Sequence, residues 1–323
     1  MELIFANHDR EDVGILKNPE LDLAFGGDEN NFECTVGIKD HCCEDGFYIY
    51  AEGTEYGGIV DAIKIDSADD TVTYSGRTWH GMLASKFLPE GLILSGDANA
   101  CIKNVLDTID LSPLFVSETE STGVQIDTYT LTEYTDAYTV LCDMLEEVGL
   151  RLRTECFEGV VTLSAVPIFD FSADKEMESD LIEYQMMKKY RKVNHLICIG
   201  LSGTVVHLYV DEEGHISEEQ TFVGIDEYAA VDGEKFEEWE NSGITVENER
   251  EELVKHGKKV LAGMLKENTI TVQFEPEDDA YYIGDIVGAY DRMTEISVSA
   301  RVSKKILSLA NGKAEIEYKV GEQ

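Results

Sequence analysis

The chain has 323 residues, of which 43% are hydrophobic and 28% charged, and its 65 acidic and 26 basic side chains leave a net charge of −39. This length and hydrophobic content suit a folded protein of two or three domains. A surface this acidic repels phosphate backbones, which argues against sequence-specific binding of nucleic acid.

The first 95 residues are predicted to be β-rich, because strand-length apolar runs are separated by Gly, Asp or Asn clusters. Alternating apolar residues over Phe32–Ile38 indicate a strand with one buried face. A short helix is expected over Thr78–Ser85. Many short strands with one helix predict a barrel-like first domain, residues 1–95.

Residues 96–168 predict a compact α+β module. One helix is expected over Ala98–Ile109 and a second over Asp136–Val148, the latter with Thr135 as its N-cap and Gly149 after its last turn. The module is predicted to end in a hairpin made of Leu150–Cys156 and Val160–Val166, which turns at Glu158 and Gly159.

β character returns over residues 169–323, which are predicted to form a second barrel-like domain. An acidic insertion and a helix over Glu249–Glu267 interrupt this domain at about residues 214–267. Gly257 breaks the apolar stripe of that helix, and we expect another backbone to approach there.

The end of the chain predicts a β-hairpin. Alternation over Ile296–Ile306 indicates a long strand, and Ala314–Val320 runs back. Between them, Asn311 and Gly312 supply the two positive-φ positions of a tight turn. Strands this regular are typical of framework rather than of catalytic loops.

Signatures of catalysis are absent from the sequence, which contains no P-loop, dinucleotide-binding, zinc-protease or nucleophile-elbow pattern. Residues Gly200 to Gly203 resemble an elbow only superficially, and a hairpin turn fits them better. Among 65 acids, a pair at glycosidase spacing is expected by chance. No catalytic or cofactor-binding residue and no cofactor is predicted.

Three segments leave a metal interpretation open. Cys42 and Cys43 follow His41, but without a second cysteine pair they are poor zinc ligands. The acidic segments Asp211–Gly214 and Glu275–Asp279 lack the alternating acids and closing glutamate of a calcium loop, so solvated turns are favoured. No metal site is predicted.

The seven cysteines are odd in number and lie mostly within apolar patterns, which favours buried thiols in a reducing compartment. His195 and His207 lie inside apolar strand patterns and His80 lies at a helix start, so packing is favoured over metal binding. Neither a signal peptide nor an apolar run of about 20 residues is present, so we expect no membrane-spanning segment.

Three segments in consistent order resemble phage tail-hub proteins, the family of trimeric caps at the distal end of a tail tube that includes the structural part of tail-associated lysins. The first is Thr71-Val-Thr-Tyr-Ser-Gly-Arg-Thr-Trp79, a strand that runs into a helix. The second is Val193-Asn-His-Leu-Ile-Cys-Ile-Gly200, and the third is Tyr282-Ile-Gly-Asp-Ile-Val287 with the long strand and hairpin after it. The motif positions are structural: Ser75, Gly76, Arg77, Trp79, Tyr282, Gly284, Asp285, Asn311 and Gly312.

The resemblance implies an α+β, β-rich fold with two tube-like β-barrel domains and the small α+β module between them. It implies a structural, non-enzymatic homotrimer that joins the tail tube to the spike or tip and contacts tube, tape-measure and spike proteins. The acidic charge would then line a lumen through which DNA slides. The expected location is the tail of a virion or phage-like particle, assembled in the cytoplasm of the host bacterium.

Other hypotheses for the function stay open from the sequence. A contractile bacteriocin-like particle would use the same hub. Outside this class, a cell-wall (peptidoglycan) hydrolase of the tail tip and a monomeric acidic binding module or adhesin are the alternatives. Because the sequence ends at Gln323, directly after the hairpin, no hydrolase extension is expected.

Overall fold

The computed structural model describes residues 1–27, 29–172, 184–187, 192–200, 202–211, 214–232, 249–265, 269–274, 281–291, 294 and 296–320. The chain forms two compact units. The first unit combines Met1–Met186 with Ile270–Gly321, and the second is Met187–Thr269. The division predicted at residues 95 and 168 remains a prediction.

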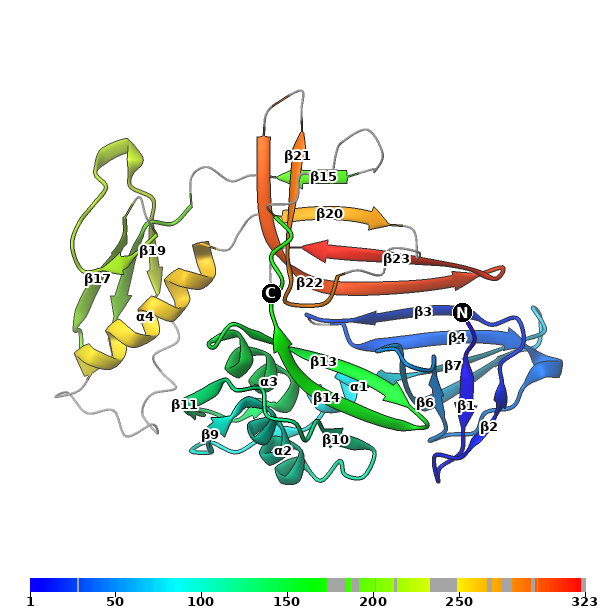
Figure 1. Cartoon of the computed structure of the whole chain (residues 1–323). Coiled ribbons are helices and arrows are strands. Elements are labelled where there is room, and N and C mark those ends of the chain that lie inside the picture. Colours follow the sequence, from blue (N-terminus) through cyan, green and yellow to red (C-terminus); the bar gives the residue numbers. More distant parts are fainter. Residues whose placement is uncertain are drawn as a thin grey trace. The chain divides into compact units, whose positions relative to one another are not determined.

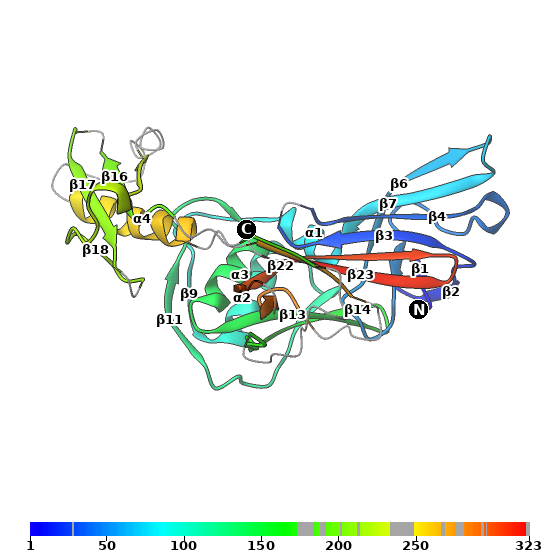
Figure 2. The same cartoon turned by 90° about the horizontal axis from the view of Figure 1, so that it is seen from above.

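One large sheet dominates the first unit (Figures 1 and 2). Within the described residues it has twelve strands, and β21 (Ile286–Asp291) pairs with β22 beside the main path. Across the sheet the order is β15 (Tyr184–Met187), β20 (Thr269–Phe274), β23 (Lys313–Val320), β22 (Ile296–Ala310), β3 (Glu20–Phe25), β4 (Asn31–Gly37), β7 (Thr71–Thr78), β6 (Gly57–Asp66), β5 (Tyr48–Tyr50), β1 (Ile4–Ala6) and β2 (Asp12–Ile15).

The two β-rich ends of the chain therefore share a sheet. β22 pairs antiparallel with β3, so that Leu309 lies opposite Leu21 and Lys305 opposite Phe25. Figure 1 shows these C-terminal strands beside the N-terminal strands β3 and β4. The predicted fold class, α+β and β-rich, is confirmed.

Strand alternation creates the core of this sheet. In β4 the side chains of Phe32, Cys34 and Val36 are buried and the intervening positions are more exposed, as the sequence pattern predicts. They pack with residues from β22 and β23, including Leu307 and Tyr318. Each large apolar side chain buried in this way stabilises the fold by about 1.5–3 kcal/mol.

The predicted α+β module of residues 96–168 packs together with the preceding residues 79–95 around a second core of the first unit, and the name module is used below for residues 79–168. Its helices are α1 (Trp79–Ala84), α2 (Ala98–Ile109) and α3 (Ala137–Glu146). Its strands are β8 (Phe87–Leu88), β9 (Ile93–Asp97), β10 (Phe115–Ser117), β11 (Gln125–Thr130), β12 (Thr135–Asp136), β13 (Leu150–Phe157) and β14 (Val160–Pro167). The predicted hairpin is present as β13–β14, with Glu158 and Gly159 both at positive φ.

The predicted N-cap of α3 is wrong by one residue. Asp136, not Thr135, is the cap, and its carboxylate accepts a hydrogen bond from the Thr139 amide at 2.9 Å. Thr135 is instead paired with Leu88 in the β12–β8 bridge. Because Thr135 is held in this strand pair, the next residue, Asp136, takes the N-cap position of the helix.

Over its described residues, the second unit is a four-stranded sheet packed on one helix. Its strand order is β18 (Ile216–Ser217), β17 (Val205–Val210), β16 (His195–Ile199) and β19 (Ala229–Asp232), with β19 parallel to β16. Helix α4 (Glu249–Leu265) packs Leu253 and Leu261 against one face. A short 3-10 turn, η2 (Gly224–Asp226), precedes β19.

The approach expected at Gly257 involves side chains rather than a backbone. A Cβ at this position would lie 2.5 Å from Cys198 Sγ and 2.7 Å from Leu208 Cδ1. The glycine therefore lets α4 lie close against β16 and β17. None of the helices over the described residues is both long and apolar enough to cross a membrane.

Candidate functional site

Asp285 is a fully buried carboxylate that ties three segments of the first unit together. Its Oδ1 accepts hydrogen bonds from Arg151 Nε at 2.7 Å and from the Phe169 amide at 3.0 Å. Its Oδ2 accepts from the Tyr282 amide at 3.0 Å, and its main-chain carbonyl accepts from Val302 at 2.9 Å. These partners compensate for the loss of water around the carboxylate.

Gly284 and Tyr282 shape the surroundings of this pair. Gly284 has φ +96°, and a Cβ there would lie 3.0 Å from Arg151 Cβ, so the position has both a conformational and a spatial reason to be glycine. The Arg151 guanidinium carbon lies 4.5 Å from the centroid of the Tyr282 ring. The Arg151 side chain therefore packs on the turn from Tyr282 to Asp285.

A second buried ion pair lies beside the first. Lys305 on β22 is fully buried, and its Nζ donates to Glu55 Oε1 at 2.7 Å and to the Tyr281 carbonyl at 3.3 Å. The same ammonium is about equally close to three ring centroids, those of Tyr56 at 5.1 Å, Tyr282 at 5.0 Å and Tyr318 at 5.4 Å. We call Arg151, Asp285, Glu55 and Lys305 the ionic junction.

His80 packs next to the ionic junction as a neutral ring. It stacks on Phe25 with centroids 4.3 Å apart and meets Tyr138 edge-on at 5.3 Å. Burial, together with the positive charge of Lys305, lowers the pKa of His80 to about 3. An imidazole with that pKa is neutral near pH 7, and its two ring contacts show that it serves packing, as the sequence predicts.

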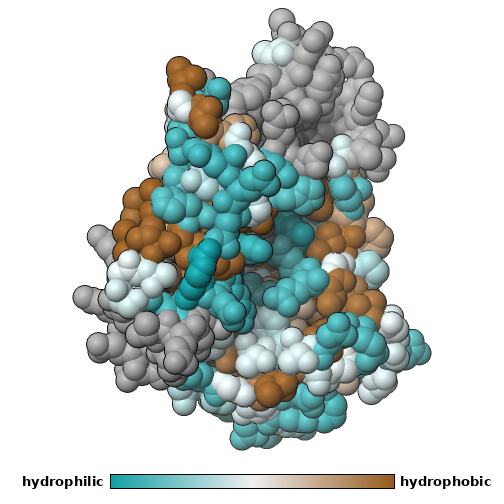
Figure 3. Space-filling model, turned by 90° about the vertical axis from the view of Figure 1, so that its left-hand side faces the viewer, coloured by the Kyte–Doolittle hydropathy of each residue, from teal (hydrophilic) through white to brown (hydrophobic). Residues whose placement is uncertain are grey.

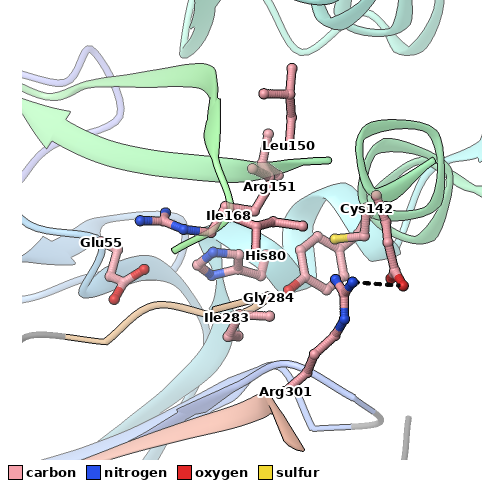
Figure 4. Close-up of a pocket in the computed structure, with 12 residues that line it drawn as sticks. Glu55, His80, Cys142, Leu150, Arg151, Ile168, Ile283, Gly284 and Arg301 are labelled. Carbon is pink, nitrogen blue, oxygen red and sulfur yellow. Dashed lines mark ion pairs between the residues drawn. The ribbon is translucent and has the colours of Figure 1, made fainter. Parts of the chain in front are cut away.

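A small cavity of about 30 Å³ lies at the ionic junction (Figure 4). His80, Arg151 and Gly284 line it, and Arg301 pairs with Glu146 at its side at 3.5 Å. That volume suits one or two water molecules, whereas small-molecule sites are about ten times larger or more. The geometry therefore fits a structural joint better than a substrate pocket.

The strand-to-helix motif positions lie in β7 and at the start of α1. Arg77 forms a two-pronged ion pair with Asp61, with Nε–Oδ2 and Nη2–Oδ1 both 2.8 Å, and this lowers the pKa of Asp61. Arg77 Nη1 also donates to Ser85 Oγ at 3.0 Å, which links β7 to the residue after α1. Ser75 lies between Glu33 and Ala62 in the sheet.

The packing around positions 76 and 79 explains why these residues are glycine and tryptophan. A Cβ at Gly76 would lie 1.9 Å from the Ile59 carbonyl oxygen. Trp79 is buried in the module core, edge-on to Phe115 at 6.3 Å. Gly76 therefore lets β7 lie close to β6 within the sheet, and Trp79 anchors the start of α1 in the module core.

Asn311 and Gly312 form the two-residue turn between β22 and β23, with φ of 54° and 77°. They close the hairpin end away from the ionic junction. The structure thus brings Tyr282, Gly284 and Asp285 together, while the other motif positions serve the β7–α1 corner and the terminal turn.

The elbow-like segment at Ser202 and the cysteine pair after His41 both make hydrogen bonds that explain them as structural. Ser202 donates its hydroxyl and its amide to the carboxylate of Glu249, and Gly203 donates to the Gly200 carbonyl at 3.0 Å, as in a hairpin turn. His41 Nδ1 and the amides of Cys42 and Cys43 contact the Tyr74 hydroxyl. Over the described residues no group of three or more His, Cys, Asp or Glu could hold a metal ion.

Of the two acidic segments considered for calcium, the structure describes Asp211 and Gly214 of the first and no residue of the second. At the first, Asp211 receives hydrogen bonds from the amide of His215 at 2.8 Å and from its ring, which makes a polar turn. Glu275–Asp279 lies outside the described residues.

Sequence reasoning missed Arg151, Glu55 and Lys305. Lys305 shares a face of β22 with the buried Leu307 and Leu309, so its place in the alternation was a usable signal of burial. Arg151 and Glu55 offered no such signal, because their partners lie far away in the sequence.

Neither a protein-family model nor a curated protein matches the chain. Three solved structures are similar over nearly the whole length. The tail protein from Neisseria meningitidis MC58 is 11% identical, with TM-score 0.55, over 100% of this chain and 96% of that one. The 43 kDa tail protein of prophage MuSo2 from Shewanella oneidensis is 11% identical, with TM-score 0.58, over 99% and 97%. The prophage tail protein gp18 from Listeria monocytogenes EGD-e is 9% identical, with TM-score 0.55, over 100% and 95%. The chain has the fold of phage tail proteins.

Proposed function

We propose that this chain, which has the fold of phage tail proteins, is the structural hub at the distal end of a phage or phage-like tail. Three copies would form a ring that joins the tube to the spike or tip. The observation that carries the proposal is the whole-chain similarity to three tail proteins, each covered over at least 95% of its own length.

The edge of the large sheet supports assembly into a ring. Among the described residues, no strand pairs with the outer side of β2, and beyond Val60 none pairs with the side of β6 that faces away from β7. Ile65 on β6 is 62% exposed, and Val13 and Ile15 on β2 are more than half exposed. Apolar side chains on open strand edges invite pairing with another chain, and a head-to-tail contact of this kind gives a ring where its rotation closes after three copies.

The surface and the ionic junction support a mechanical role. The face drawn in Figure 3 carries hydrophobic clusters among hydrophilic residues, as a surface that packs against other proteins would. The ionic junction joins β13 of the module to the turn before β21, and joins β22 to Glu55 in the segment between β5 and β6. A hub that transmits force between a tube and a tip needs such fixed joints.

Immunogold labelling of intact particles that contain this chain tests the proposed location. We expect gold only at the distal end of the tail. Gold along the shaft, or on the head, contradicts a hub. A zymogram of the purified chain on peptidoglycan is the companion experiment, since a lytic band contradicts a purely structural role.

A further inference from the structure

A row of hydrogen-bonded side chains crosses the outer face of the second unit's sheet. Glu227 Oε1 lies 2.7 Å from His195 Nδ1, and His195 Nε2 lies 2.8 Å from His207 Nδ1. The ring of Tyr209 stacks on His195 with centroids 4.3 Å apart. Because Leu196 and Leu208 pack under α4, strand alternation places the row on the opposite face.

The partners of the row fix which nitrogen carries each proton. An ionised carboxylate only accepts hydrogen bonds, so His195 Nδ1 must donate to Glu227. In a neutral ring, His195 Nε2 then has no proton and must accept from His207 Nδ1. The remaining nitrogen, His207 Nε2, belongs to an exposed side chain and can meet solvent.

We propose that the row Glu227–His195–His207 is a pH-sensitive latch that closes in neutral solution and opens in acid. One added proton enters at His207 Nε2 and leaves every hydrogen bond in place. A second proton must go to His195 Nε2, where it faces the N–H of His207. The central hydrogen bond is then lost and two positive rings repel each other.

The latch holds the segment that connects β18 to β19. His195 and Asn194 secure this segment together: the Asn194 side chain donates to the Asp226 carbonyl at 2.7 Å and accepts from the Tyr228 amide at 2.8 Å. The same segment carries Val223 and Ile225, which are 67% and 78% exposed. Opening would release the hold of β16 on a segment that carries two exposed apolar side chains.

The titratable groups in and around the row come from β16, which carries His195, from β17 and from the η2–β19 connection. β17 contributes His207 and Tyr209, and the η2–β19 connection contributes Asp226 and Glu227. On β19, the register partner of His195 is the uncharged Ala229. Two further pairs are separate from the row: Asp232 with His256 of α4, and Glu218 after β18 with Arg250 of α4.

Hydrogen exchange of the full chain tests the latch. Amides of residues 222–229 are compared at about pH 7.5 and about pH 5 as protection factors, which removes the intrinsic pH dependence of exchange. Loss of a hydrogen bond to a charged ring predicts a fall in protection of about tenfold in the wild type. In H207N the protection factor should fall by less than about twofold. The asparagine side-chain amide can donate a hydrogen bond to neutral His195 and accept one from protonated His195.

The control variant is H256N, which removes a histidine of the same unit outside the row and should keep the wild-type fall. The proposal is overturned if wild-type protection is unchanged in acid, or if H207N loses as much as the wild type. Should H207N fail to fold, nitrogen chemical shifts of the wild-type rings decide. At neutral pH they must show protons on Nδ1 of both His195 and His207, and any other tautomer pair overturns the latch.

Discussion

Arg151 and Asp285 stand 134 positions apart in the chain, yet their side chains meet at 2.7 Å and both are buried. Arg151 belongs to β13 of the module, and Asp285 precedes β21 of the large sheet. The pair therefore connects two layers of the first unit through one contact. Both groups are shielded from bulk solvent, so neither can lose its partner without a large cost.

Replacing Arg151 with methionine should destabilise the chain by about 3–5 kcal/mol, because it leaves the Asp285 carboxylate buried without its counter-ion. Urea unfolding of the variant and the wild type measures the difference. The double variant R151M/D285N removes both charges and should be more stable than R151M, but short of the wild type because one oxygen that accepts from the Phe169 or Tyr282 amide becomes an NH2 group. A single-variant effect under about 1 kcal/mol would show that the pair does not hold the layers together.

Lys305→Met should have a similar effect through Glu55, with a loss of about 3–5 kcal/mol. Lys313→Met is the matched control on the same hairpin, since Lys313 and its partner Glu315 are both 63% exposed. Surface pairs of this kind contribute about 0–1 kcal/mol. Equal effects of the two substitutions on the urea midpoint would contradict the role given to Lys305.

The pH dependence of stability should report on His80. An unfolded histidine titrates near 6.5, whereas His80 in the folded chain has a pKa of about 3. The unfolded state therefore binds more protons between these values, and stability present above about pH 6.5 is lost as the pH falls towards 3. His80→Phe retains the stack on Phe25 without titrating, so its stability relative to the wild type should rise by about 2 kcal/mol between pH 7 and pH 5. Parallel pH curves for the two proteins would refute this.

Gly76→Ala should disturb the sheet, because the new Cβ would lie 1.9 Å from the Ile59 carbonyl oxygen and a backbone must move. We expect a loss of about 2–3 kcal/mol in thermal or urea unfolding. Gly37→Ala is the control, since the nearest atom to its Cβ would be 3.7 Å away. If the two substitutions change the free energy of unfolding equally, close packing against Ile59 is not what requires glycine at position 76.

Local elements could be predicted from the sequence because their signals are local. The helix over Ala98–Ile109 and the terminal hairpin at Asn311-Gly312 have the predicted bounds or turn, since periodicity and turn chemistry act over a few residues. The Thr135 cap failed because a bridge to Leu88, invisible in the local pattern, occupies that residue.

Long-range pairing could not be predicted in the same way. Nothing within β22 or β3 specifies that these two strands are neighbours, because many apolar strands of similar length could pair. The ionic junction depends on that pairing and on the position of β13, so its two ion pairs emerge only in three dimensions. The resemblance to tail proteins located Tyr282, Gly284 and Asp285, but not the partners that explain them.

The native mass of the purified chain, measured by light scattering across concentration at moderate salt, tests the proposed hub most directly. Salt is needed because a charge of −39 on each copy opposes self-association at low ionic strength. Three copies of the 36.0 kDa chain predict 108 kDa for the wild type. The edge variant I63K/I65K, which places charges on the open side of β6, should shift the mass to that of one chain. A wild type that stays at 36.0 kDa at every concentration would contradict a ring formed by this chain alone.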